Sequence, residues 1–221
     1  MLIYKVWYTY PLFIAVGVGK VSLLLLCTDV LTGPFLTFLV FEKKKKSLRF
    51  DLTIIVAIQI AAFGYGISTV FSGRPVWMVF NVDRFDLVQK KDLEKKYADK
   101  RSSIYLTESW VGPRWVASRL PEDPELRNAL IFESAQGGAD LPQRVDLYLP
   151  LSEEGSTIRK RALNLTELYQ FNSQLEVEEL LKHWPEADSW LPMQASSQAM
   201  TVLIRKSDAR IVAIVDLRPW K

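Results

Sequence analysis

The side chains that most often carry enzyme chemistry are sparse in this sequence. Among 221 residues, His183 is the only histidine and Cys27 the only cysteine. Zinc sites use several histidine, cysteine or carboxylate ligands, so a single histidine does not predict a metal centre. His183 stands in LLKHWP, at the end of an expected helix, where the helix dipole favours a histidine. We expect no metal and no cofactor.

Sequence motifs for other enzyme classes are missing as well. The chain contains no Walker sequence, no G-x-G-x-x-G and no G-x-S-x-G elbow. Asp83, Asp86 and Asp92 could take part in carboxylate chemistry, but the tail from Ser72 contains 22 acidic residues, which favours ordinary surface charges. The residue types therefore predict a protein without enzyme activity.

Asp29 is the polar residue whose position most needs an explanation, because it lies inside the apolar run LLLLCTDVLTGPFLTFLVF. A carboxylate in the middle of a membrane span costs at least about 2.5 kcal/mol on insertion scales. Gln59 is the polar residue at a similar depth in the second apolar run, ~14 Å from the intervening loop against ~18 Å for Asp29. One hypothesis is an intramembrane contact between Asp29 and Gln59. The other is a contact from Asp29 to a helix of another protein.

Gly33 and Pro34 follow Asp29 by one helical turn. Proline has no amide hydrogen, so Pro34 leaves the carbonyl of Val30 without its helical partner and predicts a helix kink. Gly33 permits the close approach of another helix. We expect this pair to shape the helix around Asp29.

Two apolar segments would hold these residues in a membrane. Residues 12–41 contain only two charges, and residues 52–71 contain none. A bilayer core of ~30 Å needs roughly 20 apolar helical residues, so the sequence predicts transmembrane helices over 12–41 and 50–72. The first segment would be about 45 Å long as one straight helix, so it must tilt, kink at Pro34 or extend into the headgroups.

The loop between these segments, residues 42–49, predicts the topology. Its sequence EKKKKSLR carries a net charge of +4, and short basic loops stay in the cytoplasm. The residues that provide this signal are Lys43, Lys44, Lys45, Lys46 and Arg49. Residues 1–11 and 73–221 are then expected outside. The tail from Ser72 has a net charge of −1, so the chain's net +3 does not indicate nucleic-acid binding.

The expected exported domain, residues 73–221, has an α+β pattern with a mainly antiparallel sheet. Strands are predicted at 76–82, within 112–121 and at 144–151, and helices within 122–138 and within 164–184, before Pro185. The two apolar runs within 199–220 predict a terminal hairpin near the centre of the sheet. Trp7 and Trp77 are expected just outside the membrane, where indole rings prefer to lie. The domain has no cysteine and so no disulfide.

Several segments resemble one family of bacterial proteins. They are WYTYPLF, TDVLTGPFLTFLVFEKKKKSLRFDL, GRPVWMVFNVDRFDLV, GPRWVASRLP, QGGADLPQR and the terminal DLRPW. Together they resemble the TfpX/TfpZ family of type IV pilin accessory proteins from about Trp7 to the end of the chain. Members usually have another hydrophobic helix before the first of these segments. The resemblance therefore implies that residues 1–11 are the remnant of a missing first helix.

The resemblance also implies a function. Members are multi-pass proteins of the bacterial inner membrane with a periplasmic domain, and they support the assembly or function of a cognate pilin. Pilin and other inner-membrane pilus assembly proteins are the implied partners, twitching motility is the implied output, and no enzyme activity or cofactor is implied. The alternative is a membrane-anchored enzyme that modifies pilin or its glycan. The mass of pilin from a strain lacking the protein would separate these two hypotheses.

Overall fold

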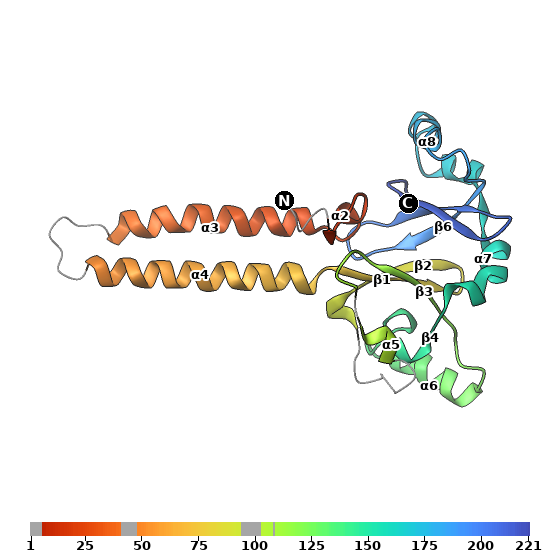
Figure 1. Cartoon of the computed structure of the whole chain (residues 1–221), viewed down its shortest axis with the longest axis horizontal. Coiled ribbons are helices and arrows are strands. Elements are labelled where there is room, and N and C mark those ends of the chain that lie inside the picture. Colours follow the sequence, from red (N-terminus) through yellow and green to blue (C-terminus); the bar gives the residue numbers. More distant parts are fainter. Residues whose placement is uncertain (1–5, 41–47, 94–102, 108) are drawn as a thin grey trace. The chain divides into compact units, whose positions relative to one another are not determined.

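The computed structural model of the chain describes residues 6–40, 48–93, 103–107 and 109–221. It divides the chain into two units, shown in Figure 1. We call Met1–Val16 together with Arg74–Lys221 the domain, and Gly17–Gly73 the helical hairpin. The predicted topology signal at Lys43–Lys46 lies outside the described residues, and its remaining member, Arg49, is exposed near the start of the second long helix.

The helices and strands have the following bounds. The α-helices are α2 (Leu12–Ala15), α3 (Val18–Val40), α4 (Leu48–Ser72), α5 (Ser103–Leu106), α6 (Pro124–Ala135), α7 (Gly155–Arg161) and α8 (Gln174–Leu181). The 3-10 helices are η1 (Lys90–Asp92), η3 (Leu141–Gln143), η4 (Val145–Leu147), η5 (Leu151–Glu154) and η6 (Leu165–Gln170). The strands are β1 (Pro75–Asn81), β2 (Arg84–Gln89), β3 (Arg114–Ser118), β4 (Tyr148–Leu149), β5 (Leu163–Asn164), β6 (Ser189–Gln194), β7 (Met200–Arg205) and β8 (Arg210–Val215).

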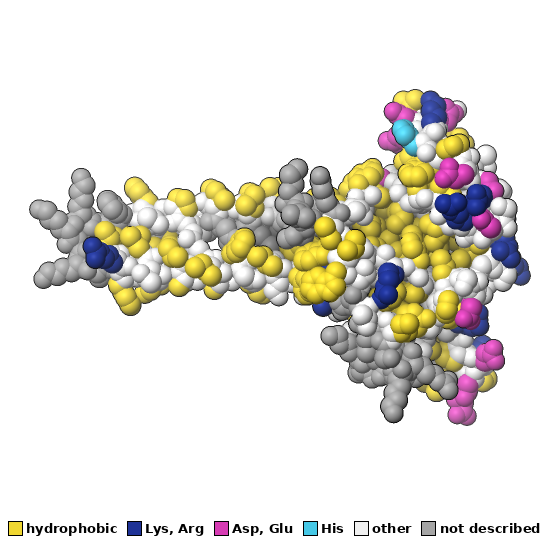
Figure 2. All heavy atoms as spheres, viewed as in Figure 1, with side chains coloured by type: hydrophobic (Ala, Val, Ile, Leu, Met, Phe, Trp, Pro, Cys, Tyr) yellow, Lys and Arg dark blue, Asp and Glu magenta, His cyan; other side chains and the backbone are white. Residues whose placement is uncertain are grey.

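The helical hairpin consists of the two long helices α3 and α4. Their 23 and 25 residues correspond to roughly 35 and 38 Å of helix. Figure 2 shows hydrophobic and uncharged side chains along most of both helices. Among the described residues, α4 is long and apolar enough to cross a membrane, whereas the apolar stretch within α3 is shorter, Val30–Leu39. Two transmembrane helices therefore stay a prediction. Pro34 lies inside α3 and does not end it.

The predicted first span, residues 12–41, is not one helix. Leu12–Ala15 forms the short helix α2, and Gly17 then takes a φ of +67°, a left-handed conformation that glycine adopts without steric cost. The carbonyl of Ala15 accepts hydrogen bonds of 3.0 Å from the amides of Ser197 and Gln198, in the turn between β6 and β7. The long helix therefore begins at Val18 and not at residue 12, where the predicted span begins. The 30-residue apolar segment is too long for one upright span because its first residues belong to the domain.

The domain is built on an eight-stranded sheet with the order β4-β3-β1-β2-β6-β7-β8, while β5 pairs with β6. Five of the seven pairings among the described strands are antiparallel, as predicted, and β1–β3 and β2–β6 are parallel. The sheet is therefore mixed. Turn residues in a sequence predict antiparallel hairpins between strands that follow one another in the chain. The two parallel pairs join strands that are distant in the chain, so turn residues did not predict them.

Two strand predictions need correction. The hairpin of β7 and β8 is present, but β8 is the edge strand and does not lie near the centre of the sheet. Residues 144–151, predicted as one half-buried strand, form the 3-10 helix η4 and the two-residue strand β4. The Tyr148 hydroxyl donates to the carbonyl of Pro142 at 2.5 Å, which holds this segment folded back on itself. The alternation of apolar and polar residues therefore predicted the wrong structure for this segment.

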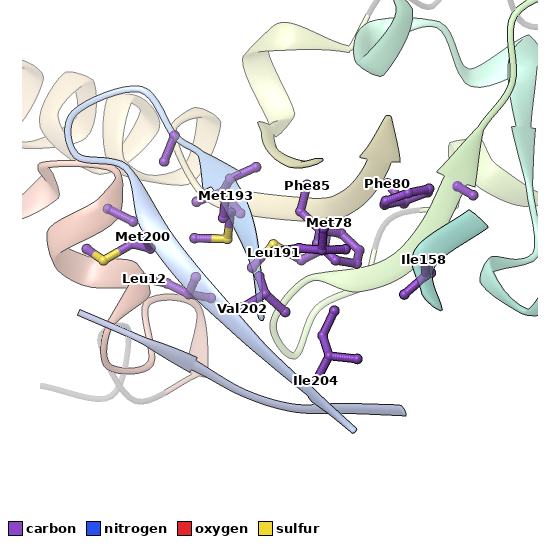
Figure 3. Close-up of a cluster of buried hydrophobic side chains, with 14 residues drawn as sticks. Leu12, Met78, Phe80, Phe85, Ile158, Leu191, Met193, Met200, Val202 and Ile204 are labelled. Atoms are coloured by element: carbon purple, nitrogen blue, oxygen red, sulfur yellow. The ribbon is translucent and has the colours of Figure 1, made fainter. Parts of the chain in front are cut away.

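The core of the domain joins the sheet to the N-terminal segment, as Figure 3 shows. Leu12 and Ala15 of α2 belong to the same buried cluster as Met78, Met193 and Met200 of the strands. Trp77 is also a core residue, 2% exposed, in a second cluster with Tyr148. The prediction that Trp77 lies at the membrane surface was therefore wrong, because on β1 its side chain points into the domain.

Candidate functional site

Gln59 of α4 lies against the backbone of α3 at Gly33. A Cβ atom at position 33 would overlap Nε2 of Gln59 and would lie 3.1 Å from its Cδ. The hydroxyl of Thr37 donates to the Gly33 carbonyl at 2.9 Å. Because only glycine leaves room for the amide, Gly33 lets a polar side chain of α4 lie directly against the α3 backbone.

Asp29 lies in α3, one turn before Gly33. Residues four apart share a face of a helix, so the Asp29 position lies on the face of α3 that meets α4 at Gln59. The Asp29 side chain is outside the part of the structure that is described. Its pairing with Gln59, and the alternative contact with another protein, both stay predictions.

A second candidate site is a groove of about 760 Å³ in the domain. It lies between α8 and the segment that runs from the end of β8 to Arg218, and Tyr10 of the N-terminal segment also lines it. Trp184 is 37% exposed and Tyr10 is 74% exposed, so both rings can contact another molecule. This groove was not predictable from the sequence, because its residues come from three distant parts of the chain.

The charges of the groove are mainly negative. Glu176 and Glu179 line it from α8, while Asp216 is paired with Arg218. Asn172 fixes the segment beside them, since its Oδ1 accepts from the Arg218 amide at 2.7 Å and its Nδ2 donates to the Arg218 carbonyl at 2.9 Å. With one acid neutralised by arginine, the two glutamates on α8 favour a partner with a positive group next to apolar side chains.

Strand β8 borders this groove and forms one edge of the sheet. Ile214 and Val215 of β8 are groove residues, and among the described strands only β7 pairs with β8. The residues Ile211–Ile214 are apolar and half-buried. An edge strand presents unpaired backbone amides and carbonyls that an extended peptide can use as one more strand. The groove and the strand edge together form a surface for an extended peptide.

Of the three aspartates considered for catalysis, Asp86 and Asp92 line one small pocket of about 200 Å³ together with Asp140, and Asp83 does not line it. Asp86 is buried, and burial raises its pKa, although the neighbouring Arg84 and Asn81 oppose that rise. Asp83 is exposed, and Asp92 accepts from the Gln89 amide at 3.2 Å, as a helix-capping residue does. Among the described residues, no group of three or more histidine, cysteine, aspartate or glutamate side chains could hold a metal ion.

His183 does line the groove, at the end of α8. Its Nδ1 lies 3.1 Å from the carbonyl of Glu179, the helix-end arrangement expected from the sequence. No serine hydroxyl or carboxylate has a hydrogen bond to this ring among the described contacts. His183 therefore lies at the groove as a helix-end residue.

Comparison with known proteins gives relatives but no structural counterpart. The chain is 31% identical over 170 residues to two fimbrial assembly proteins from different serogroups of Dichelobacter nodosus, which covers 76% of this chain and 66% of each relative. It is 36% identical over 94 residues to a third fimbrial assembly protein of the same organism, which covers 42% of this chain and 72% of that relative. No family model and no solved structure matches.

Proposed function

Because the chain belongs to the family of fimbrial assembly proteins, we propose that it is an accessory protein for the assembly of type IV pili. In this proposal the helical hairpin anchors it in the bacterial inner membrane as two spans, and the domain lies in the periplasm. The protein binds its cognate pilin and catalyses no reaction. The resemblance in sequence to the TfpX/TfpZ accessory proteins supports this finer assignment.

The observation that carries the pilin-binding role is the groove beside β8. Pilin binds there as an extended segment that pairs with the edge of β8 and directs a basic side chain to the glutamates of α8. The rings of Tyr10 and Trp184 provide apolar contact area next to these charges. Such a surface recognises a partner chain without needing a nucleotide, a metal or a catalytic base.

Two neighbouring acids on α8 give a matched pair of test variants. Glu179 lines the groove, whereas Glu178 is exposed outside it. We expect Glu179→Lys, in a strain without its own copy of the protein, to reduce surface pili several-fold at normal protein level. Glu178→Lys should leave piliation as in the wild type. Electron microscopy of pili and an immunoblot of the protein provide the readout.

The same strains test the whole proposal. Pilin from cells without the protein should have an unchanged mass while surface pili and twitching motility decrease. An altered pilin mass would support a modifying enzyme and contradict the accessory role. Equal piliation of the Glu179→Lys and Glu178→Lys strains would instead exclude the groove as the pilin-binding surface.

A further inference from the structure

An arginine lies between two tryptophans where the chain leaves α4. Helix α4 ends at Ser72, and Arg74 opens the domain. The Arg74 guanidinium carbon lies 5.7 Å from the ring centroid of Trp7 and 5.6 Å from that of Trp110. These distances are those of cation–π contacts, and the Arg74 side chain is buried, with 2% of the residue exposed.

This arrangement holds three distant segments of the domain together. The Trp7 indole donates to the carbonyl of Trp110 at 3.0 Å, so the segment before α2 is joined to the turn before β3. The backbone of Arg74 is also held in place, because its carbonyl accepts a hydrogen bond of 2.9 Å from the Lys90 amide. The turn that carries Trp110 is thus attached to the first residues after α4.

The turn itself displays apolar side chains outward. Trp110 is 65% exposed and Val111 is 77% exposed. The amide of Val111 donates to the Ser109 hydroxyl at 3.1 Å, and Gly112 takes a φ of +67°, a conformation that favours glycine. The turn thus directs two adjacent large apolar side chains to the surface, where they can contact an apolar or interfacial partner.

We propose that the turn Ser109–Gly112 is a lipid contact, in which Trp110 and Val111 lie in the headgroup layer of the membrane that α4 spans. The proposal rests on the proposed membrane anchoring. One residue separates α4 from Arg74, about 8 Å of chain at most, and the Trp110 ring stacks directly on Arg74. Tryptophan is enriched at the headgroup level of membranes, where its amphipathic ring prefers to lie. The contact would orient the domain on the bilayer.

The test uses the full chain in lipid nanodiscs, which leave both membrane faces open to solvent. A Cys27→Ser background removes the natural cysteine, and Val111→Cys carries an environment-sensitive fluorophore. The matched control is Leu175→Cys, which is 75% exposed and apolar on α8. We expect a headgroup spin label to quench the probe at 111 at least about twofold more than the probe at 175, and iodide to show the opposite order.

A third probe separates failure of this proposal from failure of the anchoring. Ile60→Cys lies on α4, where residue 60 is 68% exposed, and a spin label deep in the acyl chains should quench it. If the probe at position 60 is quenched while iodide reaches the probes at 111 and 175 equally, the proposed lipid contact of the turn is wrong and the membrane anchoring of α4 stands. Loss of quenching at 60 would overturn both. An intact chain with Trp110→Ser should also show weaker headgroup quenching at 111.

Discussion

At the scale of single residues, the contact between Gly33 and Gln59 is the most specific feature of the helical hairpin. The Gln59 amide occupies the space that any side chain at position 33 would need. Polar contacts between membrane helices contribute about 1 kcal/mol, and here the close approach of the backbone adds to the packing. Gly33 and Gln59 should therefore stabilise the hairpin as a pair, and neither should do so alone.

The pair can be tested with a double-mutant cycle. Gly33→Leu should destabilise the hairpin by roughly 1 to 3 kcal/mol through overpacking, and much of that loss should disappear when Gln59→Ala is added. Gly64→Leu is the control, because a Cβ at position 64 has no neighbour within 4 Å. Thermal unfolding of the full chain in detergent gives the measurement. If Gly33→Leu and Gln59→Ala change the stability of the chain additively, the contact between Gly33 and Gln59 does not stabilise the hairpin.

Asp29 gives a second test at this scale. With Gln59 as its partner, Asp29→Asn should be mild because an amide still bonds an amide, whereas Asp29→Leu should weaken the hairpin. With a cationic partner on pilin, Asp29→Asn should abolish twitching motility at normal protein level. An immunoblot beside the motility assay distinguishes the two. Wild-type motility and abundance of both variants would show that Asp29 has neither role.

At the scale of elements, the N-terminal segment is part of the domain core. Tyr8, Leu12 and Ala15 are 2%, 3% and 0% exposed, and Leu12 and Ala15 pack with strand residues. Residues 12–41 were predicted to lie in the membrane because they are apolar, but a core residue and a lipid-facing residue have the same apolar character. The helical hairpin is thus inserted into the sequence of the domain.

This insertion predicts how truncated proteins behave. Residues 74–221 alone should expose the surface that α2 covers, whereas residues 1–16 joined to 74–221 by a flexible linker should keep it buried. We expect a melting temperature several degrees higher for the joined protein, since burial of one leucine contributes about 1.5 to 3 kcal/mol. Leu12→Asp in the joined protein should remove the difference. Identical melting of the two proteins without the substitution would contradict a role of α2 in the core.

At the scale of the whole molecule, the path of the chain restricts which side of a membrane each part can occupy. The chain leaves the domain before Gly17 and returns to it after Gly73. If α3 and α4 both cross a membrane, both ends of the helical hairpin must be on the side where the domain lies, and the connection between the two helices must be on the other side. This agrees with the topology that the charges of residues 42–49 predict.

Reporter fusions test this topology. A reporter that is active only in the periplasm should be active after Lys221 and silent when inserted within residues 43–49, because the basic loop stays in the cytoplasm. A cytoplasmic reporter at the same two positions should give the complementary result and serves as the control. Activity inside the loop together with silence at the C-terminus would contradict the anchoring and the proposed function together.

Local features of the fold were predictable where one short segment decides them. Helix α6 begins after Asp123, whose side chain accepts from the Glu125 amide at 2.8 Å, and the chain turns at Gly137 with a φ of +81°. Strands β1 and β3 and the hairpin of β7 and β8 also follow from apolar runs and turn residues. Gln59 was expected to pair with Asp29, which stays a prediction, whereas its position against Gly33 required the packed helices.

The sequence by itself determined the apolar segments, the basic loop, the scarcity of catalytic side chains and the resemblance to pilin accessory proteins, because composition, charge and motif are properties of neighbouring residues. Only the tertiary structure decided that α2 belongs to the core, that β1 pairs in parallel with β3, and that β8 lies at an edge beside a groove. It also brought Trp7, Arg74 and Trp110 together. Each of these depends on contacts between residues far apart in the chain, which local patterns do not encode.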